Sequence, residues 1–128
     1  MAQNLIEKIA QRFAFDVKPG TEVHSGEYIF IQPMHVMTHD NTGAVMPKFK
    51  SIGATKMANP RQPVFTLDHN VQDTSEKNRL KYANIEKFGR DMGVDFYPAG
   101  RGIGHQIMCE EGYAWPGTMV VASDSHSN

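Results

Sequence analysis

An apolar run, Pro63-Val-Phe-Thr-Leu67, leads directly into two ionisable residues, Asp68 and His69. Runs of this length and composition predict short strands when turn-forming or polar residues bound them. A second run, Met119-Val-Val-Ala122, leads in the same way into a polar cluster that contains Asp124. Because ligands of open α/β sheets collect beyond the carboxyl ends of the strands, the two runs predict a polar site at one edge of a sheet.

Helical patterns alternate along the chain with strand patterns. Apolar spacing, caps and turn residues predict helices over about 4–14, 41–53, 74–92 and 105–111, and strands over 28–31, 63–67, 94–97 and 119–122. Most of the surface of the helix over 74–92 is polar, so we expect that helix to lie outside the core. The alternation indicates an α/β fold with crossover connections, built as three layers, α/β/α.

Composition narrows the class of protein. The 128 residues suffice for about one domain, and 40% hydrophobic with 21% charged residues is close to an average folded protein. Thirteen basic and fourteen acidic residues give a net charge of −1, which excludes the broad positive footprint of a general nucleic-acid binder. No apolar run approaches the ~20 residues of a membrane span, and the first residues lack a signal-peptide core. We expect neither nucleic acid nor a membrane as a partner.

Cys109 is the single cysteine of the chain. One thiol excludes an intramolecular disulfide framework and a self-contained zinc or iron–sulfur site built from cysteines. A small core-facing side chain is the interpretation that we favour for it. We assign no metal ligand in this chain.

Two further polar clusters remain open to a structural or a functional reading. Asp40 and Asn41, which follow His39, are residue types that cap helices as readily as they bind ligands. The glycines of Gly100-Arg-Gly-Ile-Gly104 lack the spacing of a nucleotide-binding loop and instead indicate a tight turn that aims His105. Each Asp-His pair taken alone is also compatible with a turn or a cap.

The sequence also carries a resemblance to a known family. The relevant runs are His35-Val-Met-Thr-His-Asp-Asn-Thr-Gly-Ala-Val45, Leu67-Asp-His-Asn-Val-Gln72, Tyr97-Pro-Ala-Gly-Arg-Gly-Ile-Gly-His-Gln-Ile107 and Ala122-Ser-Asp-Ser-His-Ser-Asn128. They resemble the first domain of the aconitase superfamily, and within it the chain is most similar to the homoaconitases of fungal mitochondria. The resemblance covers nearly the whole chain but only the beginning of such an enzyme. We therefore expect residues 1–128 to be the incomplete N-terminal part of the catalytic domain, without the cluster-binding and swivelling domains.

The resemblance implies a hydro-lyase that converts homocitrate through cis-homoaconitate to homoisocitrate in lysine biosynthesis. The resemblance implies that the enzyme is located in the mitochondrial matrix, with the cytoplasm as the alternative. Aconitate hydratase and isopropylmalate isomerase are the alternatives within the family. The family uses a [4Fe-4S] cluster held by three cysteines. Cys109 matches none of them, so we expect this chain to bind no cluster and to be inactive without the remaining domains of the enzyme.

The same resemblance implies roles for individual residues. Asp68 and His69 match a pair that assists departure of the substrate hydroxyl by donating a proton, and Ser125 matches a serine that contacts a substrate carboxylate. His39 stands where aconitases proper carry a glutamine that touches the substrate, so a substrate contact is expected there. The residues that match other parts of the polar cage are His105, Asp124 and His126.

Two readings from other classes remain. A mononuclear metal hydrolase would use Asp124 and His126, together with Asp68 or His69, as oxygen and nitrogen ligands. A non-catalytic assembly fragment would instead present the α/β scaffold to a partner chain. Metal analysis and complementation by the missing domains distinguish these readings from the hydro-lyase.

Overall fold

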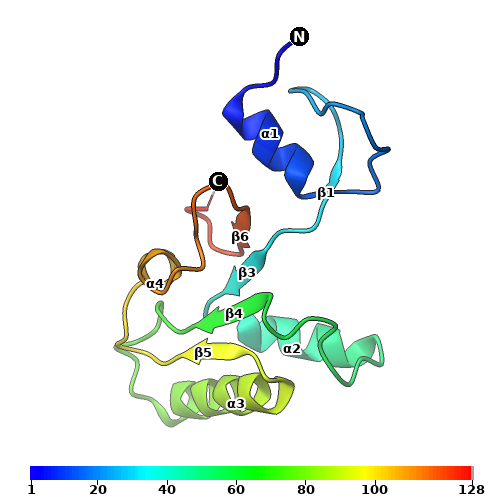
Figure 1. Ribbon diagram of the computed structural model, residues 1–128. Coiled ribbons are helices and arrows are strands. Elements are labelled where there is room, and N and C mark those ends of the chain that lie inside the picture. The colour runs from blue at the N-terminus through cyan, green and yellow to red at the C-terminus, as the bar shows by residue number, and fades with distance from the viewer. Residues whose placement is uncertain (128) are drawn as a thin grey trace.

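The centre of the molecule is a parallel sheet of four strands in the order β5-β4-β3-β6. The computed structural model describes residues 1–127 (Figure 1). The strands are β3 (His35–Thr38), β4 (Pro63–Thr66), β5 (Asp95–Tyr97) and β6 (Val120–Ala122). Met37 of β3 lies level with Val64 on one side and Ala122 on the other. All four strands therefore end at the same edge of the sheet.

Helices cover both faces of this sheet. Helices α2 (Thr42–Ser51) and α3 (Glu76–Met92) pack against one face, where Phe65 and Leu67 meet apolar side chains of both helices. Helix α4 (Gly104–Glu110) covers the other face, where its Met108 packs against Met37 and Val64. Successive side chains of a strand point to opposite faces, which is why Val64 and Phe65 belong to different core clusters. The predicted α/β fold in three layers is confirmed.

Helix α3 contributes more to the core than its sequence predicted. It begins after Ser75, whose hydroxyl accepts a hydrogen bond from the Asn78 N–H, and ends at Gly93 in the left-handed conformation, with φ 72°. Ile85 is fully buried and Phe88 is 6% exposed, so the expectation that this helix lies outside the core was wrong. The physical reason is that a few apolar residues spaced three or four apart suffice to bury one face of a helix, however polar the others are.

The central strand β3 was absent from the sequence prediction. Its four residues, His35-Val-Met-Thr38, form no long apolar run, and the strand is held by parallel neighbours on both sides. The predicted strand over 28–31 is present only as β2 (Phe30–Ile31). It pairs with β1 (Ala14–Phe15) in a separate antiparallel sheet. Sequence reasoning thus placed a strand in this region but not the one that joins the main sheet.

Residues 1–34, which we call the N-terminal segment, lie beside the layered body rather than within it (Figure 1). Helix α1 (Leu5–Arg12) has a capping box in which Asn4 and Glu7 bond reciprocally, and none of its residues is buried. The Met34 N–H donates to the Met119 carbonyl at 2.9 Å where the chain enters the body. Within residues 1–127, no helix combines the length and the apolar character needed to cross a membrane.

Candidate active site

The polar residues that follow three neighbouring strands meet at the carboxyl edge of the sheet. His39 and Asp40 follow β3, Asp68 and His69 lie just beyond β4, and Asp124 lies just beyond β6. Asp68, His69 and Asp124 line an open pocket of about 500 Å³ together with Ile103, His105 and His126, and the lining does not include His39 or Asp40. The structure therefore brings together all the residues for which the resemblance implied proton transfer or a place in the polar cage.

His69 lies between two carboxylates. Its Nδ1 atom is 2.5 Å from Asp68 Oδ1, and its Nε2 atom is 3.1 Å from Asp124 Oδ2. The side chains of Asp68 and Asp124 are each only 6% exposed, whereas His69 is 45% exposed. A neutral imidazole has one N–H, so only the doubly protonated ring can donate to both carboxylates.

The charge state of His69 follows from this arrangement. The hydrogen bond to Asp68 raises the pKa of His69 above its ordinary value, helped by the negative charges of Asp68 and Asp124 and opposed by burial. The imidazolium is therefore held at a pH where an ordinary histidine has lost its proton. A protonated ring at the mouth of a polar pocket is suited to donating a proton to a bound ligand.

Gly104 allows α4 to start directly against the site. Its N–H donates to Asp68 Oδ2 at 2.6 Å. A Cβ at this position would lie 2.6 Å from both Met37 Sδ and Thr66 Oγ1, closer than any side chain tolerates. The glycine is therefore required by close approach, while the predicted turn is made at residues 98–101, where Gly100 has φ 87° and the Arg101 N–H donates to the Pro98 carbonyl.

Asp124 organises the other side of the pocket. Its Oδ1 atom accepts the His126 N–H at 2.7 Å and lies 3.2 Å from His126 Nδ1. These bonds and the nearby His105 lower the pKa of Asp124, so it is a carboxylate at neutral pH. His105 Nε2 is 3.9 Å from Asp124 Oδ1 and 2.8 Å from Ser127 Oγ. Ser125 is exposed beside Asp124.

Asp40 is a buried carboxylate that sequence reasoning treated as a helix cap or a functional residue without deciding. It caps no helix: its oxygens accept the N–H groups of residues 68, 69 and 70 at 3.0, 3.1 and 2.9 Å. The hydroxyl of Tyr82 on α3 donates to the same carboxylate at 2.5 Å. Burial alone would raise the pKa of Asp40, but these hydrogen bonds lower it below its usual value. No sequence signal indicated these contacts, because β3 itself was not recognised.

Asn41 also does not cap α2 through its side chain. Its Oδ1 atom instead accepts hydrogen bonds from the His39 N–H at 3.2 Å and the Ser123 hydroxyl at 3.1 Å. It thereby links the segment after β3 to the segment after β6.

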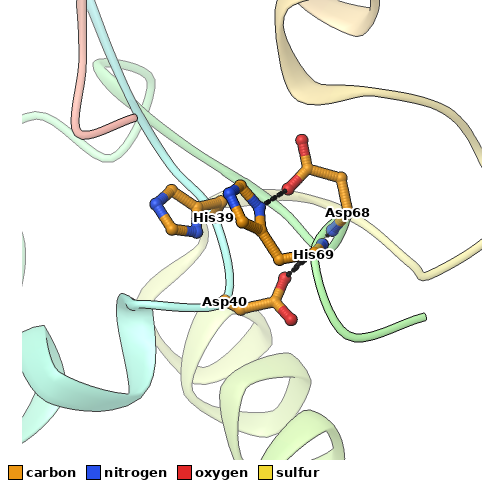
Figure 2. Close-up of side chains that lie close together, drawn as sticks. All are labelled: His39, Asp40, Asp68 and His69. Atoms are coloured by element: carbon orange, nitrogen blue, oxygen red, sulfur yellow. Dashed lines mark hydrogen bonds and ion pairs between the residues drawn. The ribbon is translucent and has the colours of Figure 1, made fainter. Parts of the chain in front are cut away.

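His39 forms a platform for His69. The two rings stack, with centroids 4.0 Å apart and planes 19° apart. Both rings are drawn in Figure 2. Burial, followed by the charge of His69, lowers the pKa of His39, so its ring is neutral. Its Nδ1 atom is buried and has no hydrogen-bond partner among residues 1–127. Because Nδ1 is buried, the structure shows His39 as a stacking partner of His69 and not as a ring that turns this nitrogen toward a ligand.

The four side chains in Figure 2, His39, Asp40, Asp68 and His69, place one ligand atom each within 4.8 Å of one another. The Asp40 oxygens, however, already accept four hydrogen bonds, and Asp68 accepts from Gly104 as well as His69. A cation would have to replace these bonds. The donor set therefore fits a proton-transfer network better than a metal centre.

The chain does not offer the ligands of an iron–sulfur cluster. A [4Fe-4S] cluster is held by cysteine thiolates, and Cys109 is the only cysteine of the sequence. Cys109 is exposed on α4, so the prediction that it faces the core was wrong. The physical reason is that its neighbours Ile107 and Met108 occupy the buried side of this short helix.

Comparisons with known proteins agree with the resemblance seen in the sequence. A model of the aconitase family (aconitate hydratase) matches residues 7–128. The mitochondrial homoaconitase of Cryptococcus neoformans is 63% identical over 98% of this chain and 17% of its own length. The mitochondrial homoaconitase of Chaetomium globosum is 66% identical over 98% of this chain and 16% of its own length. That of Yarrowia lipolytica is 60% identical over 98% of this chain and 18% of its own length. The chain thus spans less than a fifth of the length of these curated relatives.

Proposed function

This chain belongs to the aconitase family, and we propose that it forms one wall of the active site of a homoaconitase. Such an enzyme removes water from homocitrate to give cis-homoaconitate and adds it back to give homoisocitrate, in lysine biosynthesis. The relatives that carry this name support the proposal. Their names also include the word mitochondrial, which supports the mitochondrial matrix as its location. The observation that carries the proposal is the position of His69 between Asp68 and Asp124.

The residues of this chain fit the departure of the substrate hydroxyl. Dehydration breaks a C–O bond, and the leaving hydroxide is a poor leaving group unless it is protonated to water. The imidazolium of His69 donates that proton, and Asp68 keeps the ring oriented and favours its protonated form. In hydration the same ring takes the proton back from water. The base that removes the proton from carbon is not assigned to any residue here.

The remaining site residues fit binding of a polycarboxylate. The Ser125 hydroxyl and the rings of His105 and His126 are exposed or half-exposed around Asp124, where they can donate hydrogen bonds to substrate carboxylates. The substrate contact of His39 rests on the resemblance alone, because its unpaired Nδ1 atom is buried. A small tricarboxylic acid therefore fits the donors that surround this pocket.

The resemblance also implies a [4Fe-4S] cluster in the complete enzyme, where it would act as a Lewis acid. We propose that its cysteine ligands, the base and the groups that bind the distal carboxylates belong to other parts of the enzyme. The single, exposed Cys109 supports the first of these assignments. The partners of this chain would then be the remaining domains of the same enzyme.

The test is turnover by the full-length enzyme. We expect hydration of cis-homoaconitate to exceed that of cis-aconitate and of the isopropylmalate isomerase substrate, measured from the absorbance of the alkene. His69→Gln should lower kcat by about 10²–10⁴-fold, the usual contribution of a general acid. His24→Gln, in the N-terminal segment, is the matched control and should leave kcat unchanged. Comparable rates for the two variants, or zinc in place of iron on metal analysis, would contradict the proposal.

A further inference from the structure

We propose that Asp40 is a positioning residue that holds His69 in line between Asp68 and Asp124. The inference rests on the proposed function, because it assigns to a neighbouring side chain the alignment of the group that donates the proton. Asp40 is 3% exposed and lies one strand away from His69 in the sheet. It reaches the site through the backbone rather than through a substrate contact.

Asp40 makes three hydrogen bonds to one short segment of backbone. Oδ1 accepts the N–H groups of Asp68 and His69, and Oδ2 accepts the N–H of Asn70. Three consecutive peptide units are therefore oriented by a single carboxylate. This segment leaves β4 and carries the Asp68 and His69 side chains, so its orientation sets where the His69 ring points.

Asp40 is itself anchored to helix α3. The Tyr82 hydroxyl of α3 donates to Oδ2 at 2.5 Å, and burial, together with this bond, raises the pKa of Tyr82 to about 12. Tyr82 therefore stays a donor at every physiological pH. The carboxylate is thus held between the sheet and α3, and the segment 68–70 is held by the carboxylate.

The groups around Asp40 favour a carboxylate over an amide at this position. Every group that faces Asp40 in these bonds is a donor, so the site requires an atom pair that only accepts. An asparagine has nearly the same shape, but in either orientation of its amide the NH₂ group would face at least one backbone N–H of residues 68–70. Asp40→Asn is therefore expected to release part of the 68–70 segment without leaving a cavity.

The experiment compares Asp40→Asn with Tyr113→Phe in the full-length enzyme. Tyr113 is the matched control because its hydroxyl also donates to a carboxylate, Asp95, at 2.6 Å, but away from the pocket. For Asp40→Asn we expect kcat to fall about 10- to 100-fold, since small misplacements of a reacting group have effects of this size. KM should change little because the substrate contacts stay in place. Tyr113→Phe should keep kcat within about twofold even where its loss of thermal stability is similar.

Two further measurements report the alignment of the His69 ring and do not depend on enzyme turnover. Hydrogen exchange of the amides of residues 68–70 should accelerate in Asp40→Asn and stay slow in Tyr113→Phe. NMR of the histidine rings should show the pKa of His69 moving down toward its ordinary value in Asp40→Asn, from loss of the Asp40 charge and of the alignment with Asp68 and Asp124. In Tyr82→Phe the Asp40 charge stays, so a fall in the His69 pKa there reports the alignment alone. The other charged or titratable groups near this ring are His39, which stacks on it, and the carboxylate of Asp40.

The outcomes separate the two proposals. If the unmodified enzyme does not hydrate cis-homoaconitate, the proposed function fails, and hydrogen exchange with the His69 titration still decides the role of Asp40. If the enzyme is active but Asp40→Asn keeps kcat, slow exchange and the raised His69 pKa, the positioning role is overturned. Should Asp40→Asn not fold, Tyr82→Phe replaces it, and changes in the same direction but smaller are expected. No change in Tyr82→Phe would then count against the inference.

Discussion

Hydrogen bonds in the N-terminal segment and in the sheet body, residues 35–127, span different distances along the chain. In the N-terminal segment, Asn4 bonds to Glu7 three residues away, and the longer link from Gln3 to Val23 spans 20 residues. In the sheet body, Asp40 bonds to residues 28 to 42 positions away. The first region is specified mainly by neighbours in sequence, whereas the second exists only when distant strands have paired.

The N-terminal segment also buries fewer apolar side chains than the sheet body does. Helix α1 buries no residue, and Leu5, Ile6 and Phe15 are 60% to 72% exposed. In the sheet body, Met37, Val64 and Ile85 are fully buried. The hydrophobic free energy of this chain is therefore concentrated in the sheet body, which is also where the candidate site lies. Three substitution pairs test this difference.

The largest effect is expected for apolar truncation in the core. Ile85→Ala should lower the free energy of unfolding by about 2–5 kcal/mol, because it removes buried methyl groups and leaves a cavity. Leu5→Ala should change it by less than about 0.5 kcal/mol, since the side chain is 70% exposed and alanine favours the helix. Urea denaturation followed by circular dichroism measures both. Equal losses would show that the N-terminal segment shares the core.

A smaller effect is expected for glycine replacement. Gly104→Ala should cost about 1–3 kcal/mol, because the new Cβ would meet Met37 and Thr66 at 2.6 Å. Gly20→Ala, in the N-terminal segment, meets no atom within 4 Å and should cost only about 1 kcal/mol, from its φ of +84°. Thermal denaturation gives both values. The difference between the regions would be refuted by a larger loss for Gly20→Ala.

The smallest effect is a difference in pH dependence between two carboxyls. The N–H groups of Ser25 and Asn4 lower the pKa of Glu7, and the pKa of Asp40 is lowered as well. Each group therefore adds stability above its unfolded pKa of about 4, and this stability is lost as the pH falls through the lower folded value. Because Asp40 is buried, Asp40→Asn should make the free energy of unfolding less dependent on pH below pH 4. Glu7→Gln should have the same effect to a smaller degree. Urea midpoints measured across that range decide the comparison, and an equal flattening would contradict it.

Local signals in the sequence predicted the helices well. The limits of α3 follow from a serine cap and a left-handed glycine, Ser75 and Gly93, and those of α1 from the Asn4 capping box. The central strand β3 was missed because its extended state depends on β4 and β6, which are distant in sequence. Burial of Ile85 was likewise underestimated from a helix whose composition is mainly polar.

The candidate site divides in the same way. The placement of Asp68 and Asp124 after apolar runs predicted their position at one edge of the sheet, and the resemblance implied the roles that we propose for them. The contacts of Asp40 with residues 68–70 and with Tyr82 had no counterpart in the sequence pattern. Those contacts require the edge of β3 to lie beside the edge of β4.

By itself, the sequence determined the positions of the helices, the caps at Asn4 and Ser75, the alternation of helix and strand, and the ionisable residues at strand ends. These depend on the conformational preferences of residues close together in the chain. The tertiary structure alone decided that β3 is the central strand, that Gly104 must lack a side chain and that Asp40 orients the segment carrying His69. A buried carboxylate acts on whichever donors the fold brings to it, and parallel strand pairing brings those donors from far along the chain.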